Sequence, residues 1–406
     1  RNMPLTPYPL SPSIMGRGGT IPVRRAHFGE EPIAAWIAYP QGMRIGWIGC
    51  LGLAAFAAGI AVQDQPLAAN RLGGPIPGLT EVERSRFGQG RAMFAITWDL
   101  DPIAMRFNAQ TCAECHIQPT LGGTFFNEKL FVAMVPKPGS LSGFEVAHRF
   151  ETPDGKKIER RQVPPTATFR RTPALFGVGL LDAVPEVDLV RAADPNDKNG
   201  DGISGRFVRV DGKVGRLGWK GDVPDLDAFA KKAFRVELGL KAFEPGDDPE
   251  VRSLVMNQVT SAANYMRVLA PPPVPTLDER GKLGKQLFLE VGCGSCHTPS
   301  MKTGGDSAFT VLRNRRFEAY TDLLLHDIGP GPEKRLTTGP VGNREVRTPP
   351  LWGLTKFGPP FFHDASAKTI EEAIRRHQGE AERSRKAFDA LTDAQRQSVL
   401  VFLEAL

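Results

Sequence analysis

The sequence lacks a strong excess of charge of either sign. Its 406 residues carry a formal net charge of +6, with 41% hydrophobic and 24% charged residues, as in an ordinary globular protein. Residues 1–61 hold five basic and two acidic residues, so without them the net charge falls by 3 to +3. This mild balance argues against nucleic acid as a partner. The length suffices for two domains with real cores plus appendages.

The sequence also lacks a long, unbroken hydrophobic run. The most apolar segment, residues 45–61, is short and interrupted by glycines, which argues against a permanent membrane anchor. It follows Met43 and Arg44 and ends in small residues, so residues 43–61 have the form of a secretory signal peptide. A lipoprotein is disfavoured because Cys50 lies too early in the run.

Export follows from that interpretation. We interpret the Pro- and Gly-rich residues 1–42 as translation from upstream of a start at Met43, and expect them to be disordered. The mature protein is then expected in the periplasm, with no stable membrane insertion after the signal is cleaved.

Cysteine is scarce, and four of the five cysteines lie in two copies of one motif. In Cys-x-x-Cys-His, the two thiols form thioethers with one haem and the histidine becomes the proximal iron ligand. A zinc ribbon would place its pairs some 15–20 residues apart, whereas these pairs begin 293 − 112 = 181 positions apart. A redox dithiol gives no reason for a histidine after both pairs. The sequence therefore predicts two covalent c-type haems, at Cys112-Ala-Glu-Cys115-His116 and Cys293-Gly-Ser-Cys296-His297.

The two motifs belong to a divergent internal repeat. Four landmarks recur in the same order: residues 87–94 and 283–288, a Pro and a Gly-Gly pair after each haem motif, residues 171–177 and 347–353, and residues 219–226 and 363–370. The repeat predicts two cytochrome c-like units, each wrapping one haem with short helices.

We expect a mainly α fold with long Gly- and Pro-rich loops and little sheet. The proline-rich stretch 270–275 cannot continue a helix and separates an N-terminal domain, 62–270 with insertions, from a C-terminal domain, 271–406. Apolar periodicity and cap residues predict helices over 224–238, 250–269, 276–291, 367–378 and 391–405.

Several stretches of the second half resemble the bacterial di-haem oxidoreductase family. That family is also called thiol oxidoreductase-like and is related to the di-haem cytochrome c peroxidases. The stretches are Tyr320-Thr-Asp-Leu-Leu-Leu-His326-Asp-Ile-Gly, Arg347-Thr-Pro-Pro-Leu-Trp-Gly, Phe362-His363-Asp and Glu371-Glu-Ala-Ile-Arg-Arg-His377-Gln-Gly-Glu-Ala. The first half adds residues 171–181 and 201–206, so the resemblance runs from about residue 80 to the C-terminus. It implies an oxidoreductase of the peroxidase type.

Second ligands to the iron decide what each haem does, because a closed haem transfers electrons and an open one binds small molecules. His377 lies 377 − 363 = 14 residues after His363, where the resemblance implies the distal ligand of the electron-transfer haem. We predict that His377 closes the His297 haem; the alternative is a solvated helix histidine. His363 is expected to hydrogen-bond a haem propionate. His326 is either a haem-pocket group or a buried core histidine.

The first half has no histidine at the corresponding offset, since position 219 + 14 is Ala233. Either the His116 haem is five-coordinate and reactive, or His148 folds in as its second ligand. We favour the open site, because a lone histidine beside Arg149 is more often a surface residue. Three methionines are further candidates, although core packing is their commoner use: Met105, Met134 and Met266.

Two residues of the first half are candidates for the reaction itself. Through the resemblance, Trp219 aligns with the tryptophan that lies between the two haems; the alternative is core packing. Glu237 is a candidate acid/base group for O–O cleavage, and a surface carboxylate is the alternative.

A calcium loop is also suggested. Oxygen ligands alternate with glycine turns over Asp197, Asn199, Asp201 and Ile203, but Val208 replaces the expected bidentate glutamate. A polar turn is the alternative, and the resemblance implies calcium between the haems.

Together these features predict a periplasmic di-haem oxidoreductase. A small redox protein would donate electrons at the His297 haem, and Trp219 would lie on their path to the His116 haem. Peroxide, oxygen or an organic substrate would react there. The alternative is a non-enzymatic electron carrier with both haems closed. A redox sensor is less favoured, because no interaction domain is visible.

Overall fold

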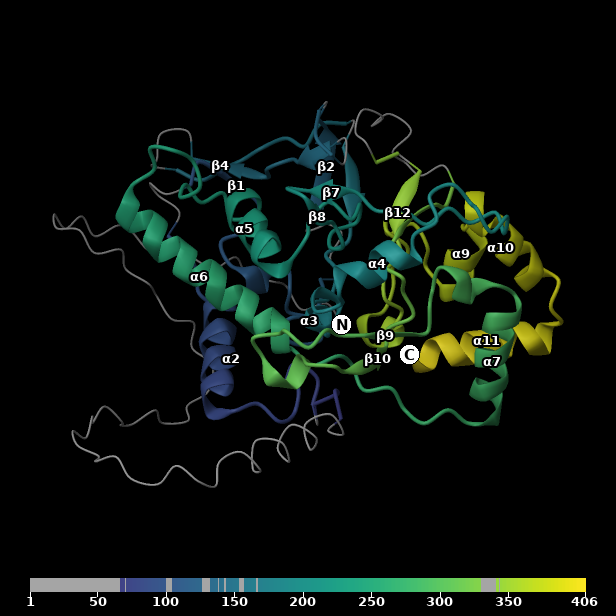
Figure 1. Cartoon of the computed structure of the whole chain (residues 1–406). Helices are drawn as coiled ribbons and strands as arrows, with labels where there is room; N and C mark the ends of the chain where they lie inside the picture. The colour runs from purple at the N-terminus through teal and green to yellow at the C-terminus, as the bar shows by residue number, and fades with distance from the viewer. Residues whose placement is uncertain are drawn as a thin grey trace, which may run out of the picture.

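The computed structural model is mainly helical (Figure 1). It describes residues 66–69, 71–99, 104–125, 132–137, 139–141, 144–152, 157–165, 167–329, 341–342 and 344–406. The expected upstream stretch, 1–42, and the signal peptide, 43–61, lie outside the described residues. None of the described helices is both long enough and apolar enough to cross a membrane.

The first half is built on a pair of crossed helices. Helix α2 (Glu81–Phe94) begins at a capping box, in which the Thr80 hydroxyl and the Glu83 side chain each accept the other residue's backbone N–H. It packs against α6 (Pro249–Val268). At the crossing, a Cβ on Gly90 would lie 2.2 Å from the Ser261 carbonyl oxygen. Glycine is therefore what allows the two backbones to approach.

The second half repeats this pair. Helix α7 (Glu279–Glu290) packs against α11 (Asp393–Ala405), and a Cβ on Gly284 would lie 1.9 Å from the Ser398 carbonyl oxygen. The two helix pairs lie on opposite sides of the molecule (Figure 1).

The shorter helices follow the same repeat. Helices α3 (Val178–Asp182) and α8 (Leu354–Phe357) each follow a glycine with φ of 74°. Helices α5 (Leu226–Val236) and α9 (Ile370–Arg375) each follow a loop closed by one antiparallel bridge, Leu217 to Val223 and Phe361 to Ala367. The remaining helices are α4 (Glu186–Ala192), α10 (Glu382–Asp389) and the 3₁₀ turns η1 (Cys112–Glu114), η3 (Cys293–Ser295), η4 (Thr310–Leu312) and η5 (Gly379–Ala381).

The strands are short and form small antiparallel sheets. The described sheets have the orders β1-β4-β5, β3-β2-β6, β10-β9, β11-β12 and β7-β8. The expectation of a mainly α fold is confirmed. The strands are β1 (Arg106–Phe107), β2 (Val132–Pro136), β3 (Phe144–Val146), β4 (Phe150–Glu151), β5 (Glu159–Arg160), β6 (Thr168–Arg170), β7 (Arg209–Val210), β8 (Lys213–Val214), β9 (Ser300–Lys302), β10 (Arg316–Glu318), β11 (Leu325–Asp327) and β12 (Glu345–Arg347).

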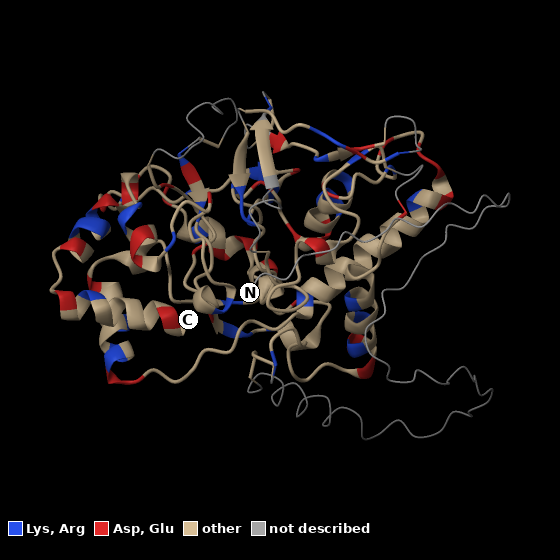
Figure 2. Cartoon of the chain, turned by 180° about the vertical axis from the view of Figure 1, so that it is seen from behind, with Lys and Arg blue, Asp and Glu red and all other residues tan. Residues whose placement is uncertain are grey.

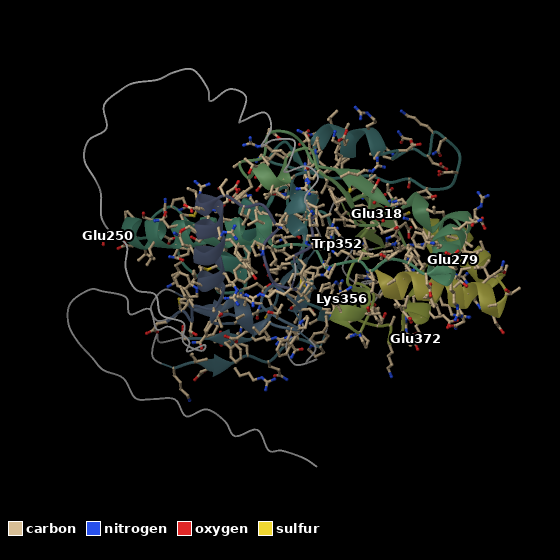
Figure 3. All side chains as sticks on the ribbon, turned by 90° about the horizontal axis from the view of Figure 1, so that it is seen from below. Glu250, Glu279, Glu318, Trp352, Lys356 and Glu372 are labelled. Carbon is tan, nitrogen blue, oxygen red and sulfur yellow. The ribbon has the colours of Figure 1, made fainter. Side chains whose placement is uncertain are left out.

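The larger hydrophobic core extends across the expected domain boundary at 270/271. It includes Phe176 and Leu269 from the first half together with Phe309, Phe317 and Trp352 from the second. A smaller core around Phe288 and Phe402 belongs to the second half alone. Trp352 lies near the centre of the molecule, between Glu250 at one end and Glu279 toward the other (Figure 3). The two-domain division stays a prediction, and its halves share one core.

Positions of basic and acidic residues are interspersed along the helices in the view of Figure 2. This mixture agrees with the mild net charge of the sequence.

Candidate functional site

The first Cys-x-x-Cys-His motif forms the single 3₁₀ turn η1, capped by the Thr111 side chain. The Nδ1 atom of His116 lies 3.1 Å from the carbonyl oxygen of Gly123. Burial lowers the pKa of His116 to about 4, so the ring is neutral near pH 7. A carbonyl only accepts, so Nδ1 carries the proton and Nε2 keeps its lone pair. This is the state that a metal ligand needs.

The second motif has the same environment. The turn η3 follows Gly292, and Nδ1 of His297 donates to the carbonyl of Tyr320 at 2.9 Å. Burial lowers the pKa of His297 to about 4. The ring of Phe288 lies 6.4 Å from that of His297, just as Phe94 lies 6.4 Å from His116 in the first half. The repeat therefore places each motif against the same kind of helix.

The four motif cysteines are not joined to one another as disulfides. Burial raises the pKa of Cys112 and that of Cys293 to about 12, so these thiols are protonated near pH 7. The thioether attachment of haem, rather than a zinc site or a redox dithiol, stays a prediction from the sequence motif.

His377 faces His297 with a separation of 6.5 Å between ring centroids. The Nδ1 atom of His377 donates to the carbonyl of Ala373 at 2.8 Å, and burial lowers the pKa of its ring. Two imidazoles bound at about 2 Å to opposite sides of one metal would have centroids roughly 6 Å apart. The two histidines thus fit one iron between them, with Nε2 available on each.

A cavity of about 430 Å³ with mostly apolar walls surrounds this pair and extends toward the first half, where Trp219 lines it. His363 also lines the cavity, and both of its ring nitrogens are buried without a hydrogen-bond partner among the described residues. Burial, together with nearby Arg170, lowers the pKa of His363 to about 3. A neutral imidazole in this position has an unused N–H for a carboxylate such as a haem propionate. The cavity and its polar groups therefore fit a haem.

His326 is buried and also lines the cavity. Its position therefore agrees with both alternatives, a haem-pocket group and a buried core histidine. Its Nε2 lies 2.8 Å from Asp322 and its Nδ1 2.9 Å from Glu380. Burial alone would lower its pKa, but hydrogen bonds to Asp322, Cys296 and Glu380 outweigh it and raise the pKa to about 12. Both ring nitrogens are occupied, so His326 is not placed as an iron ligand.

The first half has no counterpart of His377. Helix α5 corresponds to α9, and this correspondence puts Ala233 at the position of His377. The Nε2 atom of His148 is 3.0 Å from the carbonyl of Val236. In His148 the Nε2 atom therefore contacts the backbone, whereas in His116, His297 and His377 it is Nδ1 that does so. This contact favours the open site of the two alternatives.

Glu237 is not the surface carboxylate of the alternative interpretation. It ends α5, four residues after Ala233, and its Oε2 accepts a hydrogen bond of 2.8 Å from the Asn108 side chain. Burial raises its pKa, and its charge acts on the thiol of Cys115. Asn108 was not foreseen; a lone asparagine before a haem motif gives no sequence signal.

Trp219 is half-buried against Met134 and Val146 and also lines the cavity. Its contacts account for a packing role, and the role between the haems stays a prediction. Trp352 lines the same cavity from the second half. That residue lies in the repeated Arg-Thr-Pro landmark but was not singled out from the sequence.

The loop proposed for calcium satisfies its own polar groups. The side chains of Asp197, Asn199 and Asp201 accept backbone N–H groups of Gly202, Asp201 and Ile203 at 3.1, 3.0 and 2.9 Å. Within the described part of the chain, no group of three or more His, Cys, Asp or Glu residues is arranged to hold a metal ion. Calcium therefore stays a prediction, and the polar turn accounts for the contacts.

The chain was compared with known proteins. A family model described as "Di-haem oxidoreductase, putative peroxidase" matches residues 231–406, which include the second haem motif, His363 and His377. No curated protein matches the chain.

Solved structures match at low similarity. Hydrazine synthase of Kuenenia stuttgartiensis is 15% identical with a TM-score of 0.43, over 93% of this chain and 100% of that one. A MauG-like protein associated with microbial copper homeostasis is 16% identical with a TM-score of 0.41, over 84% and 94% of the two chains. The diheme peroxidase BthA of Burkholderia thailandensis is 15% identical with a TM-score of 0.38, over 82% and 87%. TM-scores this low support no conclusion about function, so the family match carries the assignment. The resemblance predicted from the sequence is confirmed over residues 231–406, which match the model of the di-haem oxidoreductase family.

Proposed function

We propose that this protein is an exported di-haem oxidoreductase of the peroxidase type, with one c-type haem on each Cys-x-x-Cys-His motif. The observation that carries the proposal is the pair formed by His297 and His377. Their rings face each other at 6.5 Å, and each donates its Nδ1 proton to a backbone carbonyl. Each Nδ1 contact fixes the orientation of its ring and leaves Nε2 for a metal.

A haem supplies one-electron chemistry, and with an open sixth position it also binds peroxide or oxygen. His297 and His377 would hold the iron of the second haem, which would suit this site to electron transfer from a small redox protein. Bis-histidine ligation would also favour a lower potential than a His/Met pair. His363 would donate its unused ring N–H to a haem propionate.

The first site is built for reaction. Ala233 offers only a methyl group where the second half has His377, and His148 is held by Val236. We infer that the iron held by His116 would keep its sixth position open to a small oxidant. Glu237, whose pKa is raised by burial, stands four residues beyond Ala233 and is placed to hold or transfer a proton there. Asn108 fixes its carboxylate. Trp219 lines the cavity around His297 and His377, and we propose that it lies on the electron path from there to the first site.

The periplasm is the proposed location. Residues 43–61 have the signal-peptide form, and thioether attachment of haem takes place outside the bacterial cytoplasm. Calcium at the loop over Asp197, Asn199, Asp201 and Ile203 is proposed on its oxygen pattern alone.

Magnetic-resonance spectra of the oxidised protein test the two sites together. We expect one low-spin signal, from the His297 site, and one high-spin signal that changes when peroxide is added. Two low-spin signals, with no carbon monoxide binding after reduction, would instead establish the electron carrier.

Haem content tests the attachment itself. Denatured protein should retain two haems per chain, because thioethers survive unfolding. Fewer than two per chain would remove the basis of the proposal.

A further inference from the structure

Arg171, in the first half, reaches into the second half. Its Nη1 donates to the carbonyl oxygens of Gly358 at 2.6 Å and Pro360 at 2.7 Å, and its Nη2 donates to that of Phe357. This segment leads directly to Phe362 and His363. The ring of Phe362 packs 5.3 Å from that of His377. Arg171 thus holds the backbone that carries one wall of the second site.

Arg347 is the repeat partner of Arg171, and it reaches the other way. Its Nε donates to the carbonyl oxygen of Gly218 at 2.7 Å, and its backbone N–H donates to that of Trp219 at 2.9 Å. In the repeat, Gly218 and Trp219 correspond to Phe362 and His363. The loop that Arg347 holds lines the cavity with Gly218 and Trp219 and leads into α5, which carries Ala233 and is capped at its C-terminus by Glu237.

The two contacts are reciprocal, and their chemistry is specific. Burial lowers the pKa of Arg171 and of Arg347 to about 10, so both guanidinium groups stay charged near pH 7. A planar guanidinium directs several N–H groups at fixed angles, whereas a lysine ammonium is a single rotating point charge. An arginine therefore fixes a set of carbonyl oxygens in space, and a lysine in its place would hold fewer of them.

We propose that Arg171 and Arg347 are positioning residues, each of which sets the haem pocket of the opposite half. The inference rests on the proposed function, since it assumes a haem at each motif. If so, the spectroscopic signature of the His297 site depends on Arg171 from the His116 half. The signature of the His116 site likewise depends on Arg347 from the His297 half. The shared hydrophobic core brings the halves together, and the two arginines align their pockets.

The test uses the haem-loaded protein and the two signals expected above. Arg171→Gln should shift the low-spin signal and the midpoint potential of the His297 site, with the high-spin signal of the His116 site unchanged. Arg347→Gln should shift the high-spin signal. Arg171→Lys keeps the buried charge but loses the planar set of guanidinium N–H donors. It should shift the low-spin signal in the same direction as Arg171→Gln, by a smaller amount. This variant keeps the test decisive if Arg171→Gln does not fold.

Two controls separate the long reach from local effects. Arg171 also donates from Nε to Thr124 Oγ1 at 3.2 Å, within its own half. Thr124→Val removes that contact together with the hydrogen bond from Thr124 Oγ1 to the Thr172 carbonyl, both within the first half, and should leave the low-spin signal in place. Arg191→Gln alters an exposed arginine that pairs with Asp188, and it should change neither signal.

The outcomes distinguish this inference from the function on which it rests. If the wild-type protein lacks two haems, the proposed function fails. If wild type and variants all carry two haems but Arg171→Gln and Arg171→Lys leave the low-spin signal unmoved, only the reciprocal positioning is overturned. The same holds if Thr124→Val reproduces the effect of Arg171→Gln.

Discussion

At the scale of single residues, the histidines of this protein differ in which ring nitrogen, Nδ1 or Nε2, makes a hydrogen bond. His116, His297 and His377 each give Nδ1 to a backbone carbonyl and leave Nε2 free. In His148 the Nε2 atom contacts a backbone carbonyl, and in His326 both ring nitrogens contact carboxylates. The chemistry of each histidine follows from that partner, because a neutral imidazole has one donor and one acceptor.

Replacing His377 should open the second site. His377→Ala removes the proposed second ligand, so the low-spin signal of the oxidised protein should become high-spin while the haem content stays at two. His148→Ala is the matched control and should leave the spectrum as in wild type. A low-spin signal that survives in His377→Ala would refute the ligand assignment.

Replacing Glu237 should affect the reaction and spare the second site. Glu237→Gln keeps the shape of the side chain but cannot carry the proton, so turnover with peroxide should fall about 10²-fold or more. The low-spin signal should not change. Glu244→Gln, at an exposed glutamate that pairs with Arg235, provides the control. Equal rates in Glu237→Gln and wild type would exclude an acid/base role.

At the scale of elements, the repeat is visible as pairs of helices that meet at the same kind of contact. Gly90 on α2 and Gly284 on α7 lie where a partner helix comes close. Helices α5 and α9 start after loops of the same length. The helices expected from periodicity and caps lie within two or three residues of α5, α6, α7 and α11, while α9 is shorter than expected.

The glycine at the helix crossing should be irreplaceable. Gly90→Ala would put a Cβ 2.2 Å from the Ser261 carbonyl oxygen and 2.7 Å from the Tyr265 Cβ, so α2 and α6 must separate. We expect a loss of about 1–3 kcal/mol in the free energy of unfolding. Gly88, on the same helix, has open space at its Cβ position, and Gly88→Ala should stabilise by about 0.5–1 kcal/mol. Thermal denaturation of both variants distinguishes them, and equal effects would contradict the crossing.

A buried carboxylate between elements predicts a pH effect. Asp182, at the end of α3, accepts the backbone N–H of Leu226 at the start of α5. Burial raises its pKa to about 6 from 3.8, despite the nearby Arg267. Between these two values the folded state binds more protons than the unfolded state, so this group's contribution to stability falls as pH rises.

Asp182→Asn keeps the accepting oxygen and removes the titration. The stability of wild type relative to this variant should therefore decrease between about pH 4 and pH 6, measured as the difference in Tm at each pH. A difference that stays constant or grows in favour of wild type would show that the carboxylate is not disfavoured by burial.

At the scale of the whole molecule, the two halves are fused through one core and exchange contacts across it. Phe309, Phe317 and Trp352 pack with residues of the first half, and Arg206 forms an ion pair with Glu345. Trp352 lies near the middle of the molecule (Figure 3). The expected boundary at 270/271 therefore marks the repeat but does not separate two independent cores.

The second half alone should be unstable. In the full chain, the side chains of Phe309, Phe317 and Trp352 are buried in the core shared with the first half. In a chain of residues 271–406 these side chains would be exposed. We expect it to lack a cooperative unfolding transition by circular dichroism, in contrast to the full chain. A transition at the same temperature as in the full chain would show that the second half folds independently.

The sequence alone determined the two haem motifs, the repeat, five of the ten described α-helices and the candidate ligand His377. These features depend on local spacing and on periodicity, which a linear pattern records. Only the tertiary structure decided which nitrogen of each histidine contacts the backbone, that the half-buried Glu237 is hydrogen-bonded to Asn108, and that the core crosses the expected boundary. It also revealed the hydrogen bonds that Arg171 and Arg347 make to the opposite half, although both residues lie in the repeated Arg-Thr-Pro stretch. Such facts depend on contacts between residues far apart in the chain, because burial and hydrogen-bond partners are set only when the halves meet.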